Sequence, residues 1–203
     1  DATFPVTELG AGSDVLADII AGRHDVCSQM VKSTRGMIIV GQSALARADG
    51  AQVLAGLKAI AEKTDMVTSD WNGFNVLHNA AARVAGLDLG LVPGEGGMDV
   101  AGMQAAGAKG DLDVVFLLGA DEIDTNAFGD AFVVYIGSHG DNGAHHADVI
   151  LPAAAYTEKP GTYVNTEGRV QRAERATFPP GDGREDWTIL RALSERLGQT
   201  LSY

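Results

Sequence analysis

The sequence predicts an α/β fold with a mainly parallel sheet flanked by helices. Short apolar runs rich in β-branched residues, each closed by Gly or Pro, are typical of buried strands. They occupy residues 37–40, 114–118, 132–136 and 149–151. Helical patterns lie between and after these runs, and strands that alternate with helices favour a parallel, Rossmann-like sheet covered on both faces. We expect these strands to be neighbours in one sheet.

The helical patterns cover residues 14–20, 50–63, 74–85, 100–108 and 186–197. Asp49 precedes the second of them as a candidate N-cap. In the last one the apolar residues recur at helical spacing, which predicts a stripe that packs on the body of the protein. The stripe consists of Trp187, Leu190, Leu193 and Leu197. A weaker pattern predicts a further strand at residues 65–68.

A polar turn at residues 165–169 separates residues 163–164 from Val170, which predicts two short strands joined by a tight turn. We expect a single α/β domain over residues 1–203. Residues 1–36 form its helical lead-in, and residues 156–184 form an irregular loop and hairpin. Because the chain begins without Met and ends directly after a helical pattern, we expect it to be a piece of a longer protein.

Composition excludes several classes of function. Lys and Arg number 15 against 27 Asp and Glu, and the net charge of −12 repels nucleic acid and anionic lipid surfaces. No apolar run approaches the ~18–20 residues that span a bilayer, so we expect no direct membrane insertion. The single cysteine, Cys27, can form no intramolecular disulfide and cannot supply the four thiolates of a usual iron–sulfur cluster.

The segment SHGDNGAHHAD, residues 138–148, holds the densest group of possible metal ligands. Imidazole and carboxylate suit zinc or iron, and the carboxyl end of a parallel strand is where ligands usually bind. The spacing matches no metal motif, however, and adjacent histidines point in different directions, so a solvated turn is the favoured interpretation and we expect no metal. The residues concerned are His139, Asp141, His145, His146 and Asp148.

Other candidate sites are weaker. The turn VGQSALARADG, residues 40–50, follows a strand and precedes a helix, where an anion can bind, but it lacks the glycine pattern of a nucleotide site. A polar loop that caps a helix is the favoured interpretation there. The loop LGADEIDTN, residues 118–126, carries acids that repel phosphate. Cys27 has only His24 nearby, which favours a half-buried helical thiol over a nucleophile.

The stretch ADVILPAAAYTEKPGTYVNTEGRVQ, residues 147–171, resembles the signature segment of the molybdopterin oxidoreductases. The closer similarity is to one branch of that family, the large iron–sulfur subunit of the NADH:quinone oxidoreductase of respiratory complex I. Further similar stretches are IIVGQSALARADGAQVLAGL, DWNGFNVLHNAAARVAGLDLG, VVFLLGADE and GREDWTILRALSERLG. Together they cover most of residues 37–200 in order.

The resemblance implies a fragment of a formate dehydrogenase/DMSO reductase-like domain that has no catalytic residues, cofactor or metal of its own. Iron–sulfur clusters are expected in an N-terminal part of the full subunit, outside this chain. The implied partners are that N-terminal part and other subunits of the peripheral arm. The implied location is the cytoplasmic face of the bacterial inner membrane or the matrix side of the mitochondrial one.

In cofactor-bearing relatives, the matching loop lies beside the pterin, and its positions here are Glu158, Gly161, Thr162, Asn165, Glu167 and Arg169. These residues can also serve the fold alone. Gly161 and Gly168 allow tight turns, Asn165 can bond its own backbone, and Glu167 can pair with Arg169 or Arg172. We therefore expect the outline of a site without its chemistry. The alternatives are a fragment of a true molybdopterin oxidoreductase such as a formate dehydrogenase, and a nucleotide-binding module that uses the VGQSAL turn.

Overall fold

The computed structural model describes residues 3–140 and 142–203, and residue contacts divide the chain into two compact units. The first unit comprises Asp1–Val84 and Val164–Arg169, and the second comprises Ala85–Tyr163 and Val170–Tyr203. The short helix α5 (Arg83–Asp88) begins where the chain passes from the first to the second. That residues 1–203 form one domain stays a prediction.

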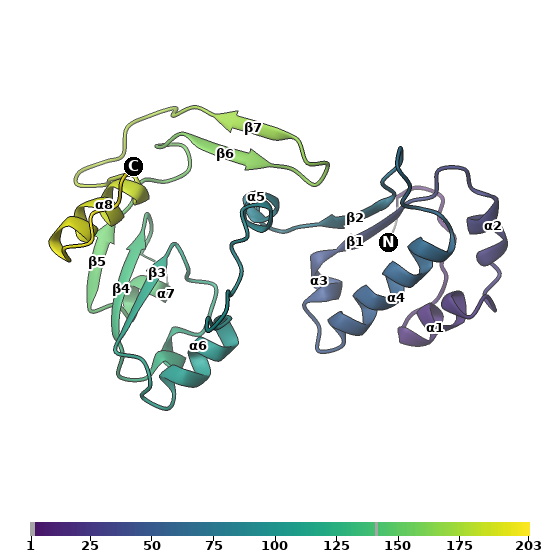
Figure 1. Cartoon of the computed structure of the whole chain (residues 1–203), viewed down its shortest axis with the longest axis horizontal. Coiled ribbons are helices and arrows are strands. Elements are labelled where there is room, and N and C mark those ends of the chain that lie inside the picture. Colours follow the sequence, from purple (N-terminus) through teal and green to yellow (C-terminus); the bar gives the residue numbers. More distant parts are fainter. Residues whose placement is uncertain (1–2, 141) are drawn as a thin grey trace. The chain divides into compact units, whose positions relative to one another are not determined.

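The first unit contains a two-stranded parallel sheet (Figure 1). Two helices precede its first strand, and two more lie between the first strand and the second. Strand β1 (Ile38–Gly41) pairs with β2 (Phe74–Leu77), with Ile38 opposite Phe74. The helices are α1 (Ser13–Ile20), α2 (Cys27–Lys32), α3 (Gln42–Leu45) and α4 (Gly50–Lys63). The expected helical lead-in is therefore present as α1 and α2.

The second unit is built on a three-stranded parallel sheet in the order β3–β4–β5. These strands are β3 (Val114–Leu118), β4 (Phe132–Gly137) and β5 (Val149–Pro152). Val114 pairs with Phe132, and Val134 pairs with Val149, so β4 is central. Helical segments connect or flank the strands, namely α6 (Val100–Gly107), η1 (Thr125–Phe128), α7 (Asn142–His145) and α8 (Asp186–Arg196).

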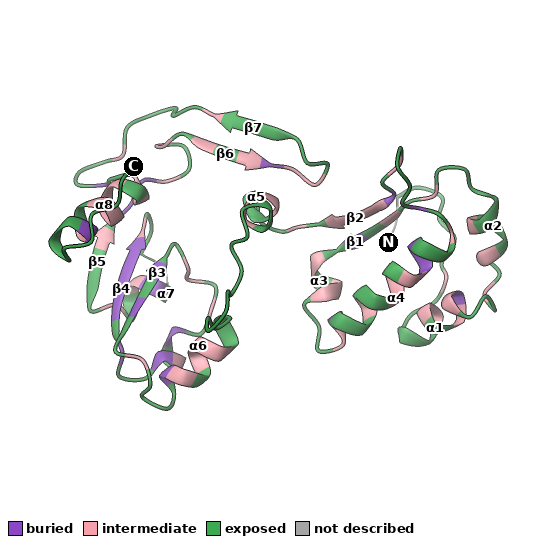
Figure 2. Ribbon diagram, in the orientation of Figure 1, coloured by how far each residue is buried: buried purple, intermediate pink, exposed green. Residues whose placement is uncertain are grey.

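The side chains of β4 enter two cores, one on each face of the sheet. Val133 and Tyr135 belong to the cluster that includes Phe128 of η1, and Met103 of α6 packs against it. Val134 and Ile136 belong to the other cluster, which Ile189 and Leu190 of α8 cover. Figure 2 shows the resulting run of buried residues along β4. Two-sided cover explains why β4 reads as a continuous apolar run.

Gly107 allows α6 to approach η1. A Cβ atom built at Gly107 would lie 2.6 Å from the Cα of Phe128, a distance that real Cβ atoms do not show. Any other residue would push α6 away from the 3₁₀ turn, and Phe128 would lose part of its cover. Gly107 is therefore required by packing rather than by its own backbone angles.

The expected hairpin is present as β6 (Gly161–Val164) and β7 (Val170–Ala173). The turn of the hairpin, Val164–Arg169, belongs to the first unit. The remaining residues of β6 and all of β7 belong to the second unit. Within the first unit, Thr166 Oγ1 donates a hydrogen bond to the carbonyl of Val76 in β2 (3.2 Å). No helix in the described part of the chain combines the length and apolarity needed to cross a membrane.

The four predicted strands exist and are parallel, but the expectation that they share one sheet is wrong. β1 pairs with β2, whereas the other three strands form a separate sheet. The cause is β2 itself, which was expected to be part of a helix at residues 74–85. The Ala-rich stretch after it favours helix, yet pairing with β1 places residues 74–77 in a strand, and helix begins only at Arg83.

The expected strand at residues 65–68 is also wrong. Asp65 has a left-handed backbone (φ 51°), and the segment contributes only a single antiparallel bridge between Val67 and Asn72. A left-handed residue interrupts the extended path that a strand needs. Trp71 lies in the turn that this bridge closes, and its ring nitrogen donates to the carbonyl of Gly36 (2.9 Å).

Two expectations about helices α4 and α8 need correction. Asp49 occupies the N-cap position of α4 but makes no side-chain cap bond, because its carboxylate binds Arg47 (Nε to Oδ1, 2.7 Å). In α8 the packed stripe is shifted. Leu190 packs with Ile189 on the sheet, whereas Trp187 is 48% exposed and Leu197 68% exposed.

Because β4 is buried on both faces, truncation of one of its side chains should destabilise the protein. Ile136 is 1% exposed, and Ile136→Ala should lower the free energy of unfolding of the 203-residue chain by about 2–5 kcal/mol through lost burial and a cavity. Ile150 in β5 is 52% exposed, so Ile150→Ala is the matched control and should cost about 1 kcal/mol or less. Urea unfolding followed by circular dichroism measures both. Equal losses at the two positions would contradict the proposed role of β4.

Candidate functional site

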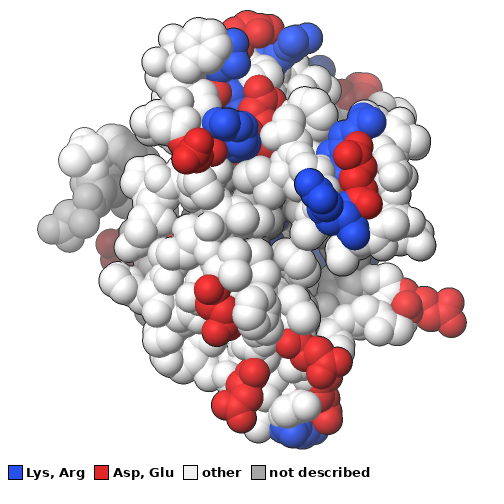
Figure 3. All heavy atoms as spheres, turned by 90° about the vertical axis from the view of Figure 1, so that its left-hand side faces the viewer, with Lys and Arg blue, Asp and Glu red and all other residues white. Residues whose placement is uncertain are grey.

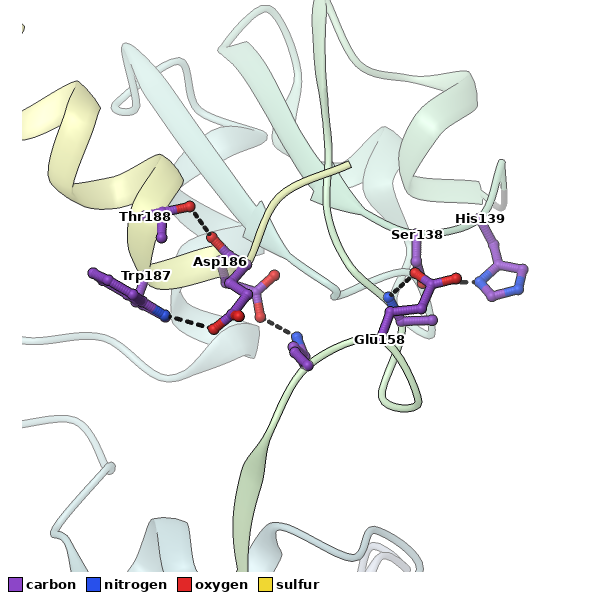
Figure 4. A network of polar contacts seen from close by, with 9 residues as sticks. Ser138, His139, Glu158, Asp186, Trp187 and Thr188 are labelled. Carbon is purple, nitrogen blue, oxygen red and sulfur yellow. Dashed lines mark hydrogen bonds and ion pairs between the residues drawn. The ribbon is translucent and has the colours of Figure 1, made fainter. Parts of the chain in front are cut away.

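The candidate site lies at the carboxyl end of the β3–β4–β5 sheet, where the loops after the three strands begin. Asp121 lies in the loop after β3, Ser138 and His139 follow β4, and Glu158 lies in the loop after β5. The carboxyl edge of a parallel sheet is the usual place for a ligand. Figure 4 shows Ser138, His139 and Glu158 as one group and Asp186, Trp187 and Thr188 at the start of α8 as another.

Glu158 closes its own loop. Its Oε2 accepts a hydrogen bond from the backbone N–H of Ala155 (2.9 Å), and its own N–H donates to the carbonyl of Ala155 (2.9 Å). These two bonds form a tight turn directly after Ala153 and Ala154, which are buried. The carboxylate is thus used by the fold, and Gln at this position could still accept the same bond.

Lys159 and Asp186 form an ion pair between the loop and the start of α8 (Figure 4). Both side chains are 28% exposed, so the pair is partly shielded from water. Asp186 lies in the first turn of α8, where a carboxylate also interacts favourably with the helix dipole. The ammonium of Lys159 is therefore neutralised within the protein.

Neighbouring polar groups of α8 are also satisfied internally. Trp187 Nε1 donates to Glu185 Oε2 (2.8 Å), and Thr188 Oγ1 donates to the Glu185 carbonyl (2.7 Å). Ala154 N–H donates to the Arg184 carbonyl (2.7 Å), which ties the end of β5 to the segment before α8. The network in Figure 4 holds protein segments together with its own donors and acceptors.

The hairpin turn is organised by Asn165. Its Oδ1 accepts hydrogen bonds from the backbone N–H groups of Glu167 (3.0 Å) and Arg169 (2.9 Å). Gly168 has a φ of 79°, which glycine adopts without strain. The predicted bonding of Asn165 to its own backbone and the turn at Gly168 are both confirmed.

The remaining loop positions, Gly161, Thr162 and Glu167, differ in their surroundings. Gly161 has no positive φ, and a Cβ there would lie 3.0 Å from Cε2 of Tyr163, a tight contact that a small shift of the Tyr163 ring would relieve. Thr162 is exposed. The expected pairing of Glu167 with Arg169 or Arg172 is absent from the ion pairs of residues 3–140 and 142–203. Arg172 pairs with Glu174 instead (Nε to Oε1, 2.8 Å).

The candidate metal ligands of residues 138–148 do not converge in the described structure. His139 Nδ1 lies 2.9 Å from Ser138 Oγ, and His145 lines a polar pocket of about 410 Å³ together with Asp121 and Asn142. His146 and Asp148 line a different pocket, and Asp148 Oδ2 accepts a hydrogen bond from the N–H of Val133 (2.8 Å).

Asp141 lies outside the described residues. Among those described, no three His, Cys, Asp or Glu side chains form a group that could hold a metal ion. That the protein binds no metal stays a prediction.

The segment between β1 and α4, which was expected to be a polar loop that caps a helix, begins with the short helix α3. Gln42 Oε1 accepts a hydrogen bond from the N–H of Asn79 (2.9 Å), and α3 is only four residues long. The guanidinium of Arg47 hydrogen-bonds Asp49 and holds the pKa of that carboxyl below its ordinary value. Cys27 is half-buried at the start of α2, with Sγ 3.5 Å from the Ile19 carbonyl.

The basic side chains near the loop are Lys159, Arg169 and Arg172, and two of them are paired with carboxylates, which disfavours the phosphates of a pterin dinucleotide. Such phosphates need cationic or N–H donors. Lys159 is already paired with Asp186, Arg172 with Glu174, and the pocket at the sheet edge is lined by Asp121. On the face drawn in Figure 3, basic side chains lie beside acidic ones. These contacts favour a structural loop, and the absence of a cofactor remains a prediction.

Sequence reasoning missed two features of this region and its surroundings. The Lys159–Asp186 pair joins residues 27 apart, so no local spacing reveals it. His78 follows β2, and its Nδ1 is buried without a hydrogen-bond partner among the described residues. The wrong helix expected at residues 74–85 concealed the position of His78 at a strand end.

Asn165→Ala should lower the free energy of unfolding by about 1 kcal/mol, because two backbone N–H groups lose their acceptor. Asn165→Asp keeps an oxygen at the same place and should retain most of the stability. Thermal and urea unfolding of the 203-residue chain measure both variants. If Asn165→Ala melts like the unsubstituted chain, the two hydrogen bonds do not organise the turn.

Comparison with known proteins identifies the family. The family model for molybdopterin oxidoreductases matches residues 1–196. The chain is 44% identical to the NADH-ubiquinone oxidoreductase 75 kDa subunit of Reclinomonas americana, over 99% of this chain and 28% of that protein. It is 45% identical to the mitochondrial 78 kDa subunit of the same enzyme from Candida albicans, over 100% of this chain and 27% of that protein.

A bacterial relative agrees. The chain is 38% identical to a subunit of the NADH-quinone oxidoreductase of Rickettsia bellii, over 96% of this chain and 27% of that protein. The chain spans 26–28% of the length of the curated relatives that it matches. The resemblance drawn from residues 147–171 is confirmed. With its parallel strands and helices on both faces of the larger sheet, the chain belongs to the molybdopterin oxidoreductase family.

Proposed function

We propose that this chain is a structural, non-catalytic part of the large iron–sulfur subunit of a NADH:quinone oxidoreductase, respiratory complex I. In this proposal it helps to form the peripheral arm that passes electrons from NADH to quinone. The relatives' names support the enzyme, at 38–45% identity over nearly the whole chain. The structural role is supported by one observation above all, namely that Glu158, Lys159 and Asn165 after β5 each bond to a neighbouring protein group.

The iron–sulfur clusters of the subunit lie outside this chain in the proposal. One cysteine, half-buried and donating to a carbonyl, suits no four-thiolate cluster. The partners are then the cluster-bearing part of the same subunit and other subunits of the peripheral arm. The location follows from those partners: the cytoplasmic face of the bacterial inner membrane or the mitochondrial matrix side.

The six loop positions are structural remnants in this proposal. Glu158 and Asn165 each use a side-chain oxygen to close a turn, and Lys159 is neutralised by Asp186. Gly161 makes room for Tyr163. A pterin site would need these groups to face a ligand, whereas Glu158, Gly161 and Asn165 are each explained by a neighbouring protein atom.

The test uses the full-length protein assembled in its native membrane complex. Glu158→Gln keeps the turn but removes the charge, and Asn165→Asp keeps the acceptor, so neither should alter NADH:quinone turnover per assembled complex. Cluster content, measured by electron paramagnetic resonance, normalises the rates. Turnover reduced about tenfold or more in a fully assembled Glu158→Gln complex would show that the loop takes part in the reaction.

Two further experiments test whether the protein belongs to complex I at all, independently of the role of the loop. Removal of the full-length protein should abolish NADH:quinone turnover in the membranes, and undiminished turnover would reject membership of complex I. Molybdenum analysis of the purified complex should find no stoichiometric metal. Stoichiometric molybdenum together with formate oxidation would instead favour a true molybdopterin oxidoreductase such as a formate dehydrogenase.

A further inference from the structure

The first unit contains an apolar cavity that plays no part in the proposed function. It has a volume of about 440 Å³ and is bordered by α1, α2 and α4. This volume falls within the ~300–1,000 Å³ of pockets that hold small ligands. Its apolar lining comes from Ile19, Cys27, Met30, Val31 and Ile60.

The lining is only partly covered by the protein itself. Ile19 and Ile60 are buried at 8% and 3% exposure, whereas Val31 is 73% exposed. The two buried isoleucines line the cavity from the inside. Covering the exposed side chain of Val31 with an apolar group is favourable, because it removes apolar surface from water. The cavity therefore favours an apolar occupant over water.

Two lysines also line this cavity, Lys32 at the end of α2 and Lys63 at the end of α4. Lysine can place its apolar stem along such a wall and keep its ammonium at the edge. Lys63 Nζ donates to the carbonyl of Ile20 (2.9 Å), which uses one of its three donors. Neither lysine takes part in the ion pairs found among residues 3–140 and 142–203.

Two of the three carboxylates on the bordering helices are engaged elsewhere, and the third, Asp14, lies in the first turn of α1, at the opposite end of that helix from the cavity residue Ile19. Asp18 of α1 binds Arg23 (2.6 Å between Oδ1 and Nη2), and Glu62 of α4 lies 3.8 Å from the ammonium of Lys58. In a chain with 15 basic and 27 acidic residues, two cations at one apolar cavity create a local site for an anion. The overall charge of −12 still disfavours broad anionic surfaces, so the anion must be small and held close.

We propose that the cavity between α1, α2 and α4 binds a single-chain anionic amphiphile, a fatty-acid carboxylate. The alkyl chain lies against Ile19, Met30 and Ile60, and the carboxylate lies between the ammonium groups of Lys32 and Lys63. An amphiphile with a cationic head finds the same apolar wall but is repelled at the edge. The sign of the head group is thus the distinguishing property.

Cys27 provides a built-in probe because it lines the cavity and is the single cysteine of the chain. The alkylation rate of Cys27 by iodoacetamide is measured on the 203-residue chain while dodecanoate is added below its micellar concentration. We expect saturable protection of at least about fivefold. Dodecyltrimethylammonium, which has the same chain length and the opposite charge, should give less than about a third of that protection at equal concentration.

Charge-removing variants test the role of the head group. Lys32→Met and Lys63→Met keep an apolar stem, and each should weaken dodecanoate binding about two- to fivefold, the range of a partly exposed ion pair. Lys58→Met, at a lysine of α4 outside the cavity lining, is the matched control and should leave binding unchanged. Circular dichroism checks that each variant is folded. Lys32→Met is the cleaner of the two changes, because it leaves intact the hydrogen bond from Lys63 Nζ to the carbonyl of Ile20.

Three outcomes would overturn the proposal. The first is no protection of Cys27 by dodecanoate, which would leave the apolar wall for a protein partner. The second is equal protection by the cationic amphiphile, which would reduce the cavity to a general apolar surface. The third is unchanged dodecanoate affinity in folded Lys32→Met and Lys63→Met chains.

Discussion

The burial of β4 on both faces is the constraint on which the second unit depends. Val133 and Tyr135 enter one core and Val134 and Ile136 the other, so helices must cover both sides of the strand. Parallel strands are stable only with such cover, because their connections cross over the sheet and leave helices on its faces. The positions of α6, η1 and α7 on one face and α8 on the other follow from this requirement.

The same constraint determines where the polar loops gather. In a parallel sheet, every strand delivers its loop to the same edge, so Asp121, Ser138 and Glu158 follow the carboxyl ends of their strands. Such an edge is suited to a ligand, yet its buried or half-buried polar groups need partners whether or not a ligand is present. In this protein Glu158 and Lys159 find those partners in Ala155 and Asp186. A fold can thus retain the outline of a binding site because its own turns require the same residues.

The sequence predicted features that depend on neighbouring residues and missed those that depend on distant ones. The strands at residues 114–118, 132–136 and 149–151 were predicted from their uninterrupted apolar runs, although only β4 is buried on both faces, since alternate residues of β3 and most of β5 are exposed. The bonding of Asn165 to its own turn was predictable because donor and acceptor lie within four residues. The pairing of β1 with β2 was not, since the Ala-rich segment after β2 favours helix and only contact with β1 overrides it. Lys159 with Asp186, and the cavity between α1, α2 and α4, likewise arise from tertiary packing.

The central claim is that the segment from the end of β5 through the β6–β7 turn is held by its own side chains and needs no ligand. Hydrogen exchange of the backbone amides of Glu167 and Arg169 in the ligand-free 203-residue chain tests this directly. The N–H groups of both residues donate to Asn165 Oδ1, so the account predicts exchange slowed about tenfold or more relative to an unstructured peptide. Exchange at unprotected rates, with the amides of β4 still protected, would show that the turn is not formed without a ligand and would contradict the account.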